Sequence, residues 1–455
     1  MNSTQSAVER NINSKFYLLS STIVAALGGL LFGFDTAVIS GTTNQLQHVF
    51  SLNEFWLGFT VAIALIGTIV GSISSGKPGE KYGRRNVMIV LALLFAISAL
   101  GSGLTHNWYL FLIYRFIGGL GVGGASVISP MYIAEIAPAR LRGRLVAVQQ
   151  FNIVLGILVA FFSNYFISKL IADSLAWRWM FAVETVPAVL FMILLFFIPE
   201  SPRWLIKYGR MDEARDILYK TGEQEVDRQV DEIIESLETP QKQQEEKFFS
   251  SKYKVPIITA MAIAIFNQLT GINAILYYAP RIFQMTGLSM DASLLQTIAV
   301  GITNMIFTVI AMTIIDRIGR KKLLLIGSVG MFITLGLVAQ SFYFQNFDGY
   351  SVMLYLIGFI AFFAVSQGAV IWVYISEIFP NMVRSEGQSL GTFTHWVMNA
   401  VVAWSFPVMA SSLGGGNSFM FFSLMMVLQF FFVFKFVPET KGKSLEQIQK
   451  DLNIQ

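Results

Sequence analysis

Long apolar runs constrain the fold of this chain more than any other feature of its sequence. A membrane-spanning helix needs about 20 mostly apolar residues, and runs of that length recur along the whole chain. They form two groups of six with a polar segment between them, near 17–41, 55–75, 86–105, 108–135, 145–168 and 179–198, and near 255–281, 293–315, 323–343, 351–377, 387–409 and 417–437. Only 13% of the 455 residues are charged, too few to cover soluble domains of that total length. We therefore expect an all-α membrane protein with twelve transmembrane helices.

The positions of Lys and Arg predict the orientation. With the N-terminus in the cytoplasm, all but four of the 32 Lys and Arg residues fall on the cytoplasmic side. Lys169, Arg178 and Arg281 lie in the opposite loops, and Arg115 lies within a span. Because cytoplasmic loops are enriched in Lys and Arg, we expect a multi-pass protein of the cell (inner) membrane with both termini cytoplasmic.

The two groups of six runs resemble each other. Three charged or Pro-containing segments recur about half a chain apart: 80–85 with 316–321, 132–138 with 374–380, and 199–201 with 438–440. Parallel duplicated halves are a transporter architecture in which the substrate is held between the halves near the midplane of the membrane.

The repeat predicts four regions. We expect an N-terminal six-helix bundle at 1–198, a cytoplasmic linker at 199–254, a C-terminal six-helix bundle at 255–437 and a cytoplasmic tail at 438–455. The linker is strongly charged, and its apolar residues have helical spacing, at Ala214, Ile217, Leu218, Val226, Val230, Ile233, Ile234 and Leu237. This pattern predicts amphipathic helices that either brace the halves or form a solvated tether.

Several kinds of chemistry are disfavoured. The chain has no Cys and only three His residues, far apart at 48, 106 and 395, so a metal site or a Ser–His triad is not expected. The glycine-rich segment 118–124 lies inside an apolar run, which indicates close helix packing rather than a nucleotide loop. We expect neither an enzyme nor a resident cofactor.

Three ionisable residues lie inside the first six spans, where charge is costly and indicates function. Asp35, Arg115 and Glu184 are each predicted at roughly 8–10 Å below the outer surface, which permits one cluster. An Arg beside a carboxylate favours its ionised form. We expect Asp35 to carry a proton, Arg115 to control its release and Glu184 to modulate the pair; a static salt bridge is the alternative.

Neutral amides and aromatic side chains gather in the second half. Such amides donate and accept hydrogen bonds at once, and aromatic side chains offer an apolar face, so together they suit a neutral polar ligand. The candidates are Asn267, Gln268, Asn273, Tyr277, Asn304, Trp372, His395 and Trp396, with Gln150 from the first half. The spacing of Gln268, Asn273 and Tyr277 allows one shared helix face. Taken singly, each amide also suits contacts between helices.

Five motifs in order along the chain carry a family resemblance. They are 33–41 (Gly-Phe-Asp-Thr-Ala-Val-Ile-Ser-Gly), 115–119 (Arg-Phe-Ile-Gly-Gly), 199–204 (Pro-Glu-Ser-Pro-Arg-Trp), 268–273 (Gln-Leu-Thr-Gly-Ile-Asn) and 438–442 (Pro-Glu-Thr-Lys-Gly). The chain resembles the sugar porters of the major facilitator superfamily, especially bacterial xylose–proton and hexose–proton symporters. The resemblance implies sugar contacts at Gln150, Gln268, Asn273, Asn304, Trp372 and Trp396. Asn267 and His395 depart from the usual pattern of that family, which has Gln at the first position and commonly a neutral amide at the second.

Charged residues at the inner ends of the spans form a further set. They are Glu80, Arg84, Arg85, Glu135, Arg142, Asp316, Arg320, Glu377 and Arg384. We expect opposite charges to pair across the two halves while the inner gate is closed, and to separate when it opens. Positive-inside topology alone would explain the Arg residues but not the repeated acids.

These observations favour a monomeric secondary transporter that imports a neutral monosaccharide with a proton, by alternating access. An uncoupled facilitator of the same sugar is the main alternative. A sugar sensor, disfavoured by the short tail, and a drug efflux porter, disfavoured by the amide cluster, are weaker ones.

Overall fold

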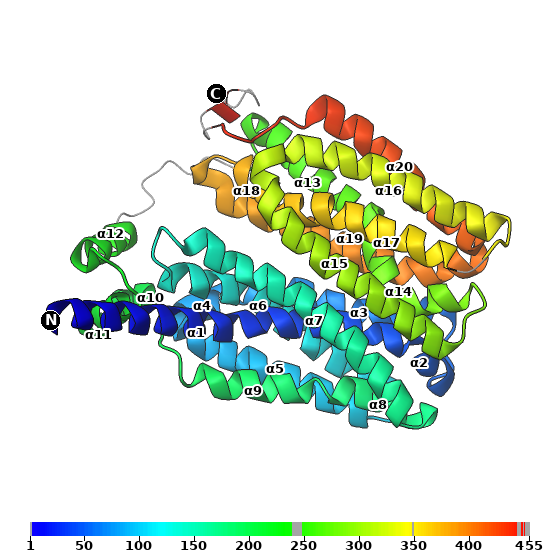
Figure 1. Cartoon of the computed structure of the whole chain (residues 1–455), viewed down its shortest axis with the longest axis horizontal. Helices are drawn as coiled ribbons and strands as arrows, with labels where there is room; N and C mark the ends of the chain where they lie inside the picture. Colours follow the sequence, from blue (N-terminus) through cyan, green and yellow to red (C-terminus); the bar gives the residue numbers. More distant parts are fainter. Residues whose placement is uncertain (1, 239–247, 348–349, 444–446, 449, 451–455) are drawn as a thin grey trace. The chain divides into compact units, whose positions relative to one another are not determined.

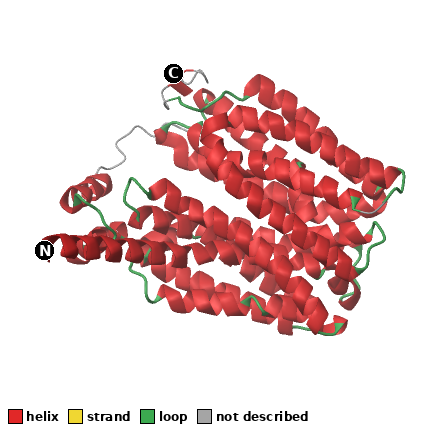
Figure 2. Ribbon diagram, viewed as in Figure 1, coloured by secondary structure: helices red, strands yellow, loops and turns green. Residues whose placement is uncertain are grey.

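The chain is helical throughout the part that the structure describes. A computed structural model describes residues 2–238, 248–347, 350–443, 447–448 and 450. Within these ranges Figure 2 shows helices joined by short loops and no strand. The predicted all-α fold is confirmed for this part of the chain.

The first half supplies the helices labelled α1 to α9 in Figure 1. Their bounds are α1 Asn2–Val38, α2 Thr43–Val49, α3 Glu54–Ser74, α4 Gly76–Tyr82, α5 Arg84–Leu104, α6 Trp108–Ile136, α7 Arg142–Leu170, α8 Asp173–Ala182 and α9 Thr185–Leu195. The sequence predicted one continuous span at 179–198, whereas the structure breaks it at Val183 and Glu184. Pro187 explains the break, because its ring nitrogen has no hydrogen to donate to the carbonyl of Val183.

The linker folds into three short helices. They are α10 Pro202–Lys207, α11 Met211–Lys220 and α12 Val226–Glu238. Their apolar faces pack together, with Leu205, Ala214, Leu218 and Val230 buried, so the predicted amphipathic helices are confirmed. The Tyr208 hydroxyl donates to the backbone oxygen of Lys81 at 3.0 Å. Residues 199–238 are therefore docked on the first half rather than a free tether, while 239–247 lie outside the described residues.

The second half supplies the remaining helices. They are α13 Lys254–Leu269, α14 Ile272–Gln284, α15 Met290–Ile318, α16 Arg320–Tyr343, α17 Ser351–Phe363, α18 Ala369–Glu377, α19 Arg384–Ser412 and α20 Gly414–Phe436. Gly271 separates α13 from α14 with φ of 81° in the left-handed region, which glycine adopts without strain. A π-helical turn, Ala364–Gly368, joins α17 to α18.

Eleven helices or joined helices in the described part are long and apolar enough to cross a membrane. The expected span at 387–409 falls on α19, which has 29 residues but is not among the eleven. Polar side chains such as Glu386, Gln388, His395 and Asn399 lower its hydropathy. The length of α19 still matches that of α6 and α7, so a twelve-helix membrane protein is consistent with the structure.

Two compact units make up the chain. The first contains Met1–Thr36, Gly67–Ile157 and Phe181–Lys242; the second contains Ala37–Ile66, Leu158–Met180 and Gln243–Gln455. The borders cut through α1, α3, α7 and α8, so one end of each of these helices packs with the second half of the sequence. The boundaries predicted from the repeat, at 198 and 255, therefore stay predictions.

Glycines let helices approach closely inside the first unit. A Cβ on Gly123 of α6 would lie 2.2 Å from the backbone oxygen of Thr68 on α3, a distance that no side chain tolerates. The glycine-rich segment 118–124 therefore serves helix packing, as the sequence predicted.

Candidate functional site

A buried ion pair joins α1 and α6. The Arg115 guanidinium donates from Nη1 to Asp35 Oδ1 at 2.5 Å and from Nη2 to the Asp35 backbone oxygen at 3.2 Å. The side chains are 2% and 3% exposed. Phe181 covers the guanidinium, with its ring centroid 5.3 Å away. Removing one member of such a pair would leave the other charge buried and unpaired.

Glu184 lies at the break between α8 and α9 in the same unit. Its side chain is 1% exposed, and its Oε1 has no hydrogen-bond partner in the described part of the chain. The charged groups that act on it electrostatically are Asp35 and Arg115. Gly118 leaves room beside the pair, because a Cβ there would lie 3.3 Å from Asp35 Oδ1. The predicted clustering of the three ionisable residues is confirmed; their roles stay predictions.

Four amides of the second unit, three of them buried, form a hydrogen-bonded chain that runs in one direction. Asn273 donates to Gln268 Oε1 at 2.7 Å, and Gln268 donates to Asn267 Oδ1 at 3.2 Å. Asn267 in turn donates to the backbone oxygen of Gln367 at 3.4 Å and to its Oε1 at 3.5 Å. Gln268, Asn267 and Gln367 are each at most 2% exposed. We call Asn273, Gln268, Asn267 and Gln367 the amide chain.

His395 connects the amide chain to two tryptophans. Both of its ring nitrogens lie within 3.3 Å of Gln268 Nε2. Its ring is 4.8 Å from that of Trp372 and 5.3 Å from that of Trp396. The structure thus brings neutral hydrogen-bonding groups and aromatic faces together, which is the combination that a sugar requires.

The remaining predicted sugar contacts have mixed outcomes. Tyr277 is buried, and its hydroxyl accepts a hydrogen bond from Asn399 at 3.1 Å. Asn304 is 6% exposed on α15. Gln150 is half-buried on α7 and belongs to the other unit. The predicted shared helix face was wrong, because Gly271 ends α13 after Gln268 and the other two residues lie on α14.

Charged residues at the start of α5 form a cluster within the first unit. Arg84 pairs with Glu135 at 2.9 Å, and Ser201 also donates to Glu135. Glu200 accepts the backbone N–H groups of Arg84 at 2.9 Å and of Arg85 at 3.1 Å. A carboxylate at a helix N-terminus satisfies N–H groups that have no partner inside the helix.

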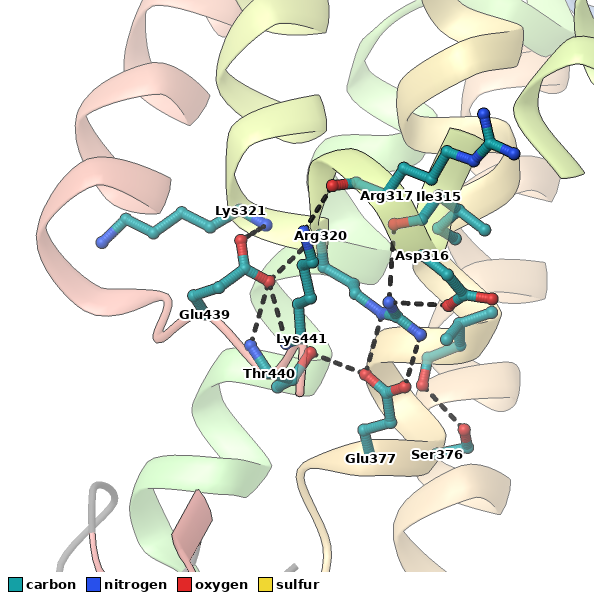
Figure 3. Close-up of polar contacts among 11 residues, drawn as sticks. Ile315, Asp316, Arg317, Arg320, Lys321, Ser376, Glu377, Glu439, Thr440 and Lys441 are labelled. Carbon is teal, nitrogen blue, oxygen red and sulfur yellow. Dashed lines mark hydrogen bonds and ion pairs between the residues drawn. The ribbon is translucent and has the colours of Figure 1, made fainter. Parts of the chain in front are cut away.

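The second unit repeats this arrangement at the start of α16, as Figure 3 shows. Arg320 pairs with Glu377 at 2.8 Å, and Thr440 donates to Glu377 at 2.6 Å. Glu439 accepts the backbone N–H groups of Arg320 at 2.8 Å and of Lys321 at 3.1 Å. The repeated motifs therefore encode the same hydrogen-bonded cluster twice.

The predicted pairing across the two halves needs correction. Arg84–Glu135 and Arg320–Glu377 each lie within one half, because α5 and α6, like α16 and α18, are neighbours in the same bundle. Asp316 pairs with Arg320 at 2.9 Å.

The other members of this predicted set make weaker contacts. Glu80 lies 3.7 Å from Lys207, and Arg85 donates to the backbone oxygen of Ile198. Arg142 donates to the backbone oxygen of Ala134. The Nε of Arg384 has no partner among the described residues.

Residues near the loops after the first and seventh spans form a third cluster, the outer cluster, defined as Gln47, Glu54 and Arg281. Arg281 Nη2 lies 2.7 and 2.8 Å from the two carboxylate oxygens of Glu54, and Nη1 donates to Gln47 at 3.0 Å. Asn44 donates to Gln284 nearby. All these residues belong to the second unit.

Sequence reasoning gave no site role to several residues of these clusters. Glu200 and Glu439 entered the sequence analysis only as part of a repeated motif, although a Glu at the same position of both repeats indicates a shared structural role. Arg281 was counted only as a loop charge. Gln367 had no signal, because a lone Gln in an apolar run does not reveal which helix it contacts.

Comparison with known proteins identifies the family. A family model described as sugar (and other) transporter matches residues 21–452. The chain belongs to this transporter family. The prediction of a transporter rather than an enzyme is therefore confirmed, and with it the assignment to a multi-pass membrane protein.

Individual relatives match over nearly the whole chain. The D-xylose-proton symporter of Escherichia coli (strain K12) is 43% identical, covering 95% of each chain. The arabinose-proton symporter of Bacillus subtilis (strain 168) is 39% identical, covering 99% of each. The inward-open structure of the xylose transporter XylE from E. coli superposes with a TM-score of 0.85 at 41% identity, covering 95% of this chain and 99% of that one. The major facilitator fold that the sequence predicted is confirmed.

Proposed function

We propose that this protein imports a neutral monosaccharide, a hexose or a pentose, together with a proton. It works as a monomer in the inner membrane, with both termini in the cytoplasm. The observation that carries the proposal is the buried Asp35–Arg115 pair with Glu184 beside it, in a chain that also holds an uncharged cluster of amides and tryptophans. Two relatives named as sugar–proton symporters support the coupling.

The proton site follows from the cost of buried charge. While Arg115 touches Asp35, each charge compensates the other. A conformational change that separates them would leave Asp35 as a buried charge without a partner, and proton uptake removes that charge. Movement of α1 against α6 would thereby couple a proton to the transport cycle, with Glu184 as the neighbouring acid.

The sugar site follows from hydrogen-bond chemistry. Sugar hydroxyls both donate and accept, as amides do, and the apolar face of the ring suits a tryptophan. The amide chain, His395, Asn304, Trp372 and Trp396 supply these groups, with Tyr277 beside them. Gln150 would contribute from the first half. The absence of a charged side chain from this set favours a neutral substrate.

Alternating access requires contacts that break in turn. The clusters around Glu135 and Glu377 lie at the inner ends of the spans, and the outer cluster lies at the opposite ends. Single ion pairs near water contribute only about 0–1 kcal/mol, but several together bias a two-state equilibrium. We assign the bundles 1–198 and 255–437 as the moving domains and the linker 199–254 as a brace.

Uptake into proteoliposomes tests this function. Radiolabelled xylose, glucose and galactose would be offered with and without an inward proton gradient, to the native protein and to Asp35→Asn. We expect the native protein to accumulate sugar above equilibrium only when the proton gradient is present. Asp35→Asn should abolish this accumulation but still exchange sugar across the membrane. Asp291→Asn, in an exposed pair with Lys169, is the matched control and should accumulate normally. If the sugar only equilibrates across the membrane, with or without the proton gradient and equally in Asp35→Asn, the protein would instead be a facilitator.

A further inference from the structure

A π-helical turn interrupts the tenth span beside the amide chain. Ala364–Gly368 adopts this wider turn between α17 and α18, and π turns inside helices occur frequently at functional sites. Ser366 and Gln367 on this turn are 0% and 1% exposed. Ser366 satisfies its hydroxyl locally by donating to the backbone oxygen of Phe362 at 2.5 Å. Gln367 is the residue of this turn that reaches the candidate sugar site.

The direction of the amide chain determines which atoms remain at its two ends. Each amide donates to the next, from Asn273 through Gln268 and Asn267 to Gln367. Gln367 uses only its acceptor atoms in this chain, and its Nε2 group has no hydrogen bond to any residue that the structure describes. At the other end, the Oδ1 of Asn273 likewise accepts no hydrogen bond from a described residue. The chain therefore ends in a free acceptor on one side and a free donor on the other.

A donor on a largely buried side chain gains from a hydrogen-bond partner, because it has lost most of its contact with water. Gln367 is 1% exposed and bonds directly to Asn267, and its Nε2 is not among the fully enclosed atoms without a partner, so a ligand can reach it. A sugar hydroxyl can act as donor or as acceptor. Because one end of the amide chain is a donor and the other is an acceptor, the site determines whether each hydroxyl that binds there accepts or donates.

We propose that Gln367 is a specificity-determining residue that donates a hydrogen bond from Nε2 to one sugar hydroxyl. Gln367 also accepts a hydrogen bond from Asn267, which fixes the direction of the amide chain. That direction leaves Oδ1 of Asn273 as an acceptor, so a second sugar hydroxyl must donate to it. The substrate class is thus a monosaccharide with one hydroxyl accepting at Gln367 and another donating at Asn273. This inference rests on the proposed sugar transport, although it does not depend on proton coupling.

Equilibrium binding to the purified full-length protein tests the inference. D-xylose and D-glucose, and their monodeoxy and monodeoxyfluoro analogues, would be titrated by calorimetry and by the fluorescence of the tryptophans at the site. Fluorine accepts a hydrogen bond weakly but cannot donate one. We expect a deoxyfluoro analogue to keep most of its affinity at the position facing Gln367 and to lose it at the position facing Asn273.

Variants assign the interaction to Gln367. Gln367→Met preserves length and removes the hydrogen bonds, and we expect Kd for the parent sugar to rise about 5- to 20-fold. The deoxy analogue that lacks the accepting hydroxyl should bind the native protein and the variant equally. Gln429→Met is the matched control, because Gln429 is also a buried amide of the second half, bonded to Ser328 at 3.0 Å. Its sugar Kd should stay native.

A compensating pair keeps the test valid if Gln367→Met does not fold. Gln367→Asn alone should weaken binding, and Gln367→Asn with Asn267→Gln, which moves one methylene across the pair, should recover part of the loss. Failure of the double variant to improve on the single one would overturn the proposal. So would a Kd for Gln367→Met within twofold of native, or an equal loss for every analogue. A native protein that binds none of the sugars would instead contradict the proposed function itself.

Discussion

Neutralising Arg281 should shift the transporter toward the state in which the outer cluster is open. Arg281 binds both carboxylate oxygens of Glu54, at 2.7 and 2.8 Å, and Gln47 at 3.0 Å. The two charged side chains are 22% and 26% exposed, so the pair is partly shielded from water. A charge-assisted, two-pronged contact of this kind contributes about 1–2 kcal/mol. Its loss in Arg281→Gln should change the ratio of open to closed populations about 5- to 30-fold.

Distance measurements between spin labels would report this shift. The chain contains no Cys, so two introduced cysteines are labelled without background. Val49→Cys on α2 and Met285→Cys just after α14 suit this purpose, since the native side chains are 48% and 38% exposed. Double electron–electron resonance on this pair would compare native and Arg281→Gln proteins in nanodiscs. We expect the longer-distance population to grow in the variant.

Two controls decide whether the ion pair causes the shift. Arg228→Gln removes an Arg that is paired with Glu232 on the exposed linker, and it should leave the distances unchanged. Reversing the pair, with Glu54→Arg and Arg281→Glu together, should restore part of the closed population. An unchanged distribution in Arg281→Gln, or a reversed pair that behaves like the single variant, would refute the reasoning.

Three further predictions follow from the contacts described above. Arg115→Gln should destabilise the purified protein by about 3–5 kcal/mol, because it leaves Asp35 buried without its partner. Adding Asp35→Asn should recover much of the lost stability, measured by thermal melting. A double variant whose loss is the sum of the two single losses would contradict this. Glu439→Gln should cost about 1–3 kcal/mol, since it removes the charge that accepts backbone N–H groups at the start of α16, measured as a lower melting temperature with sugar affinity retained. Gly271→Ala should cost at least about 1–2 kcal/mol from its left-handed backbone and a Cβ 2.7 Å from Phe422, and native stability with native sugar affinity would show that the bend is not required.

Much of the fold was predictable because membrane insertion is decided locally. The apolar runs and the duplicated motifs depend on short segments, and they led to the membrane-spanning helices and to the two matching clusters at the starts of α5 and α16. The orientation read from the Lys and Arg positions stays a prediction. The cluster of Asp35, Arg115 and Glu184 was also predictable, since a charge inside a span needs a partner and depth can be counted along a helix.

Side-chain partners across helices could not be predicted in the same way. A helix that is apolar on all sides gives no amphipathic pattern to show which face meets which neighbour. The contact of Gln367 with Asn267 depends on a π turn in one helix and a break in another, and the pairing of Arg84 and Arg320 within their own halves depends on which helices are adjacent. The sequence by itself therefore determined the spans, the repeat and the types of residue available for sugar and proton. Only the tertiary structure decided which of them touch, because those contacts join residues that can be more than 200 positions apart in the sequence, as for Gln47 and Arg281, which are 234 positions apart.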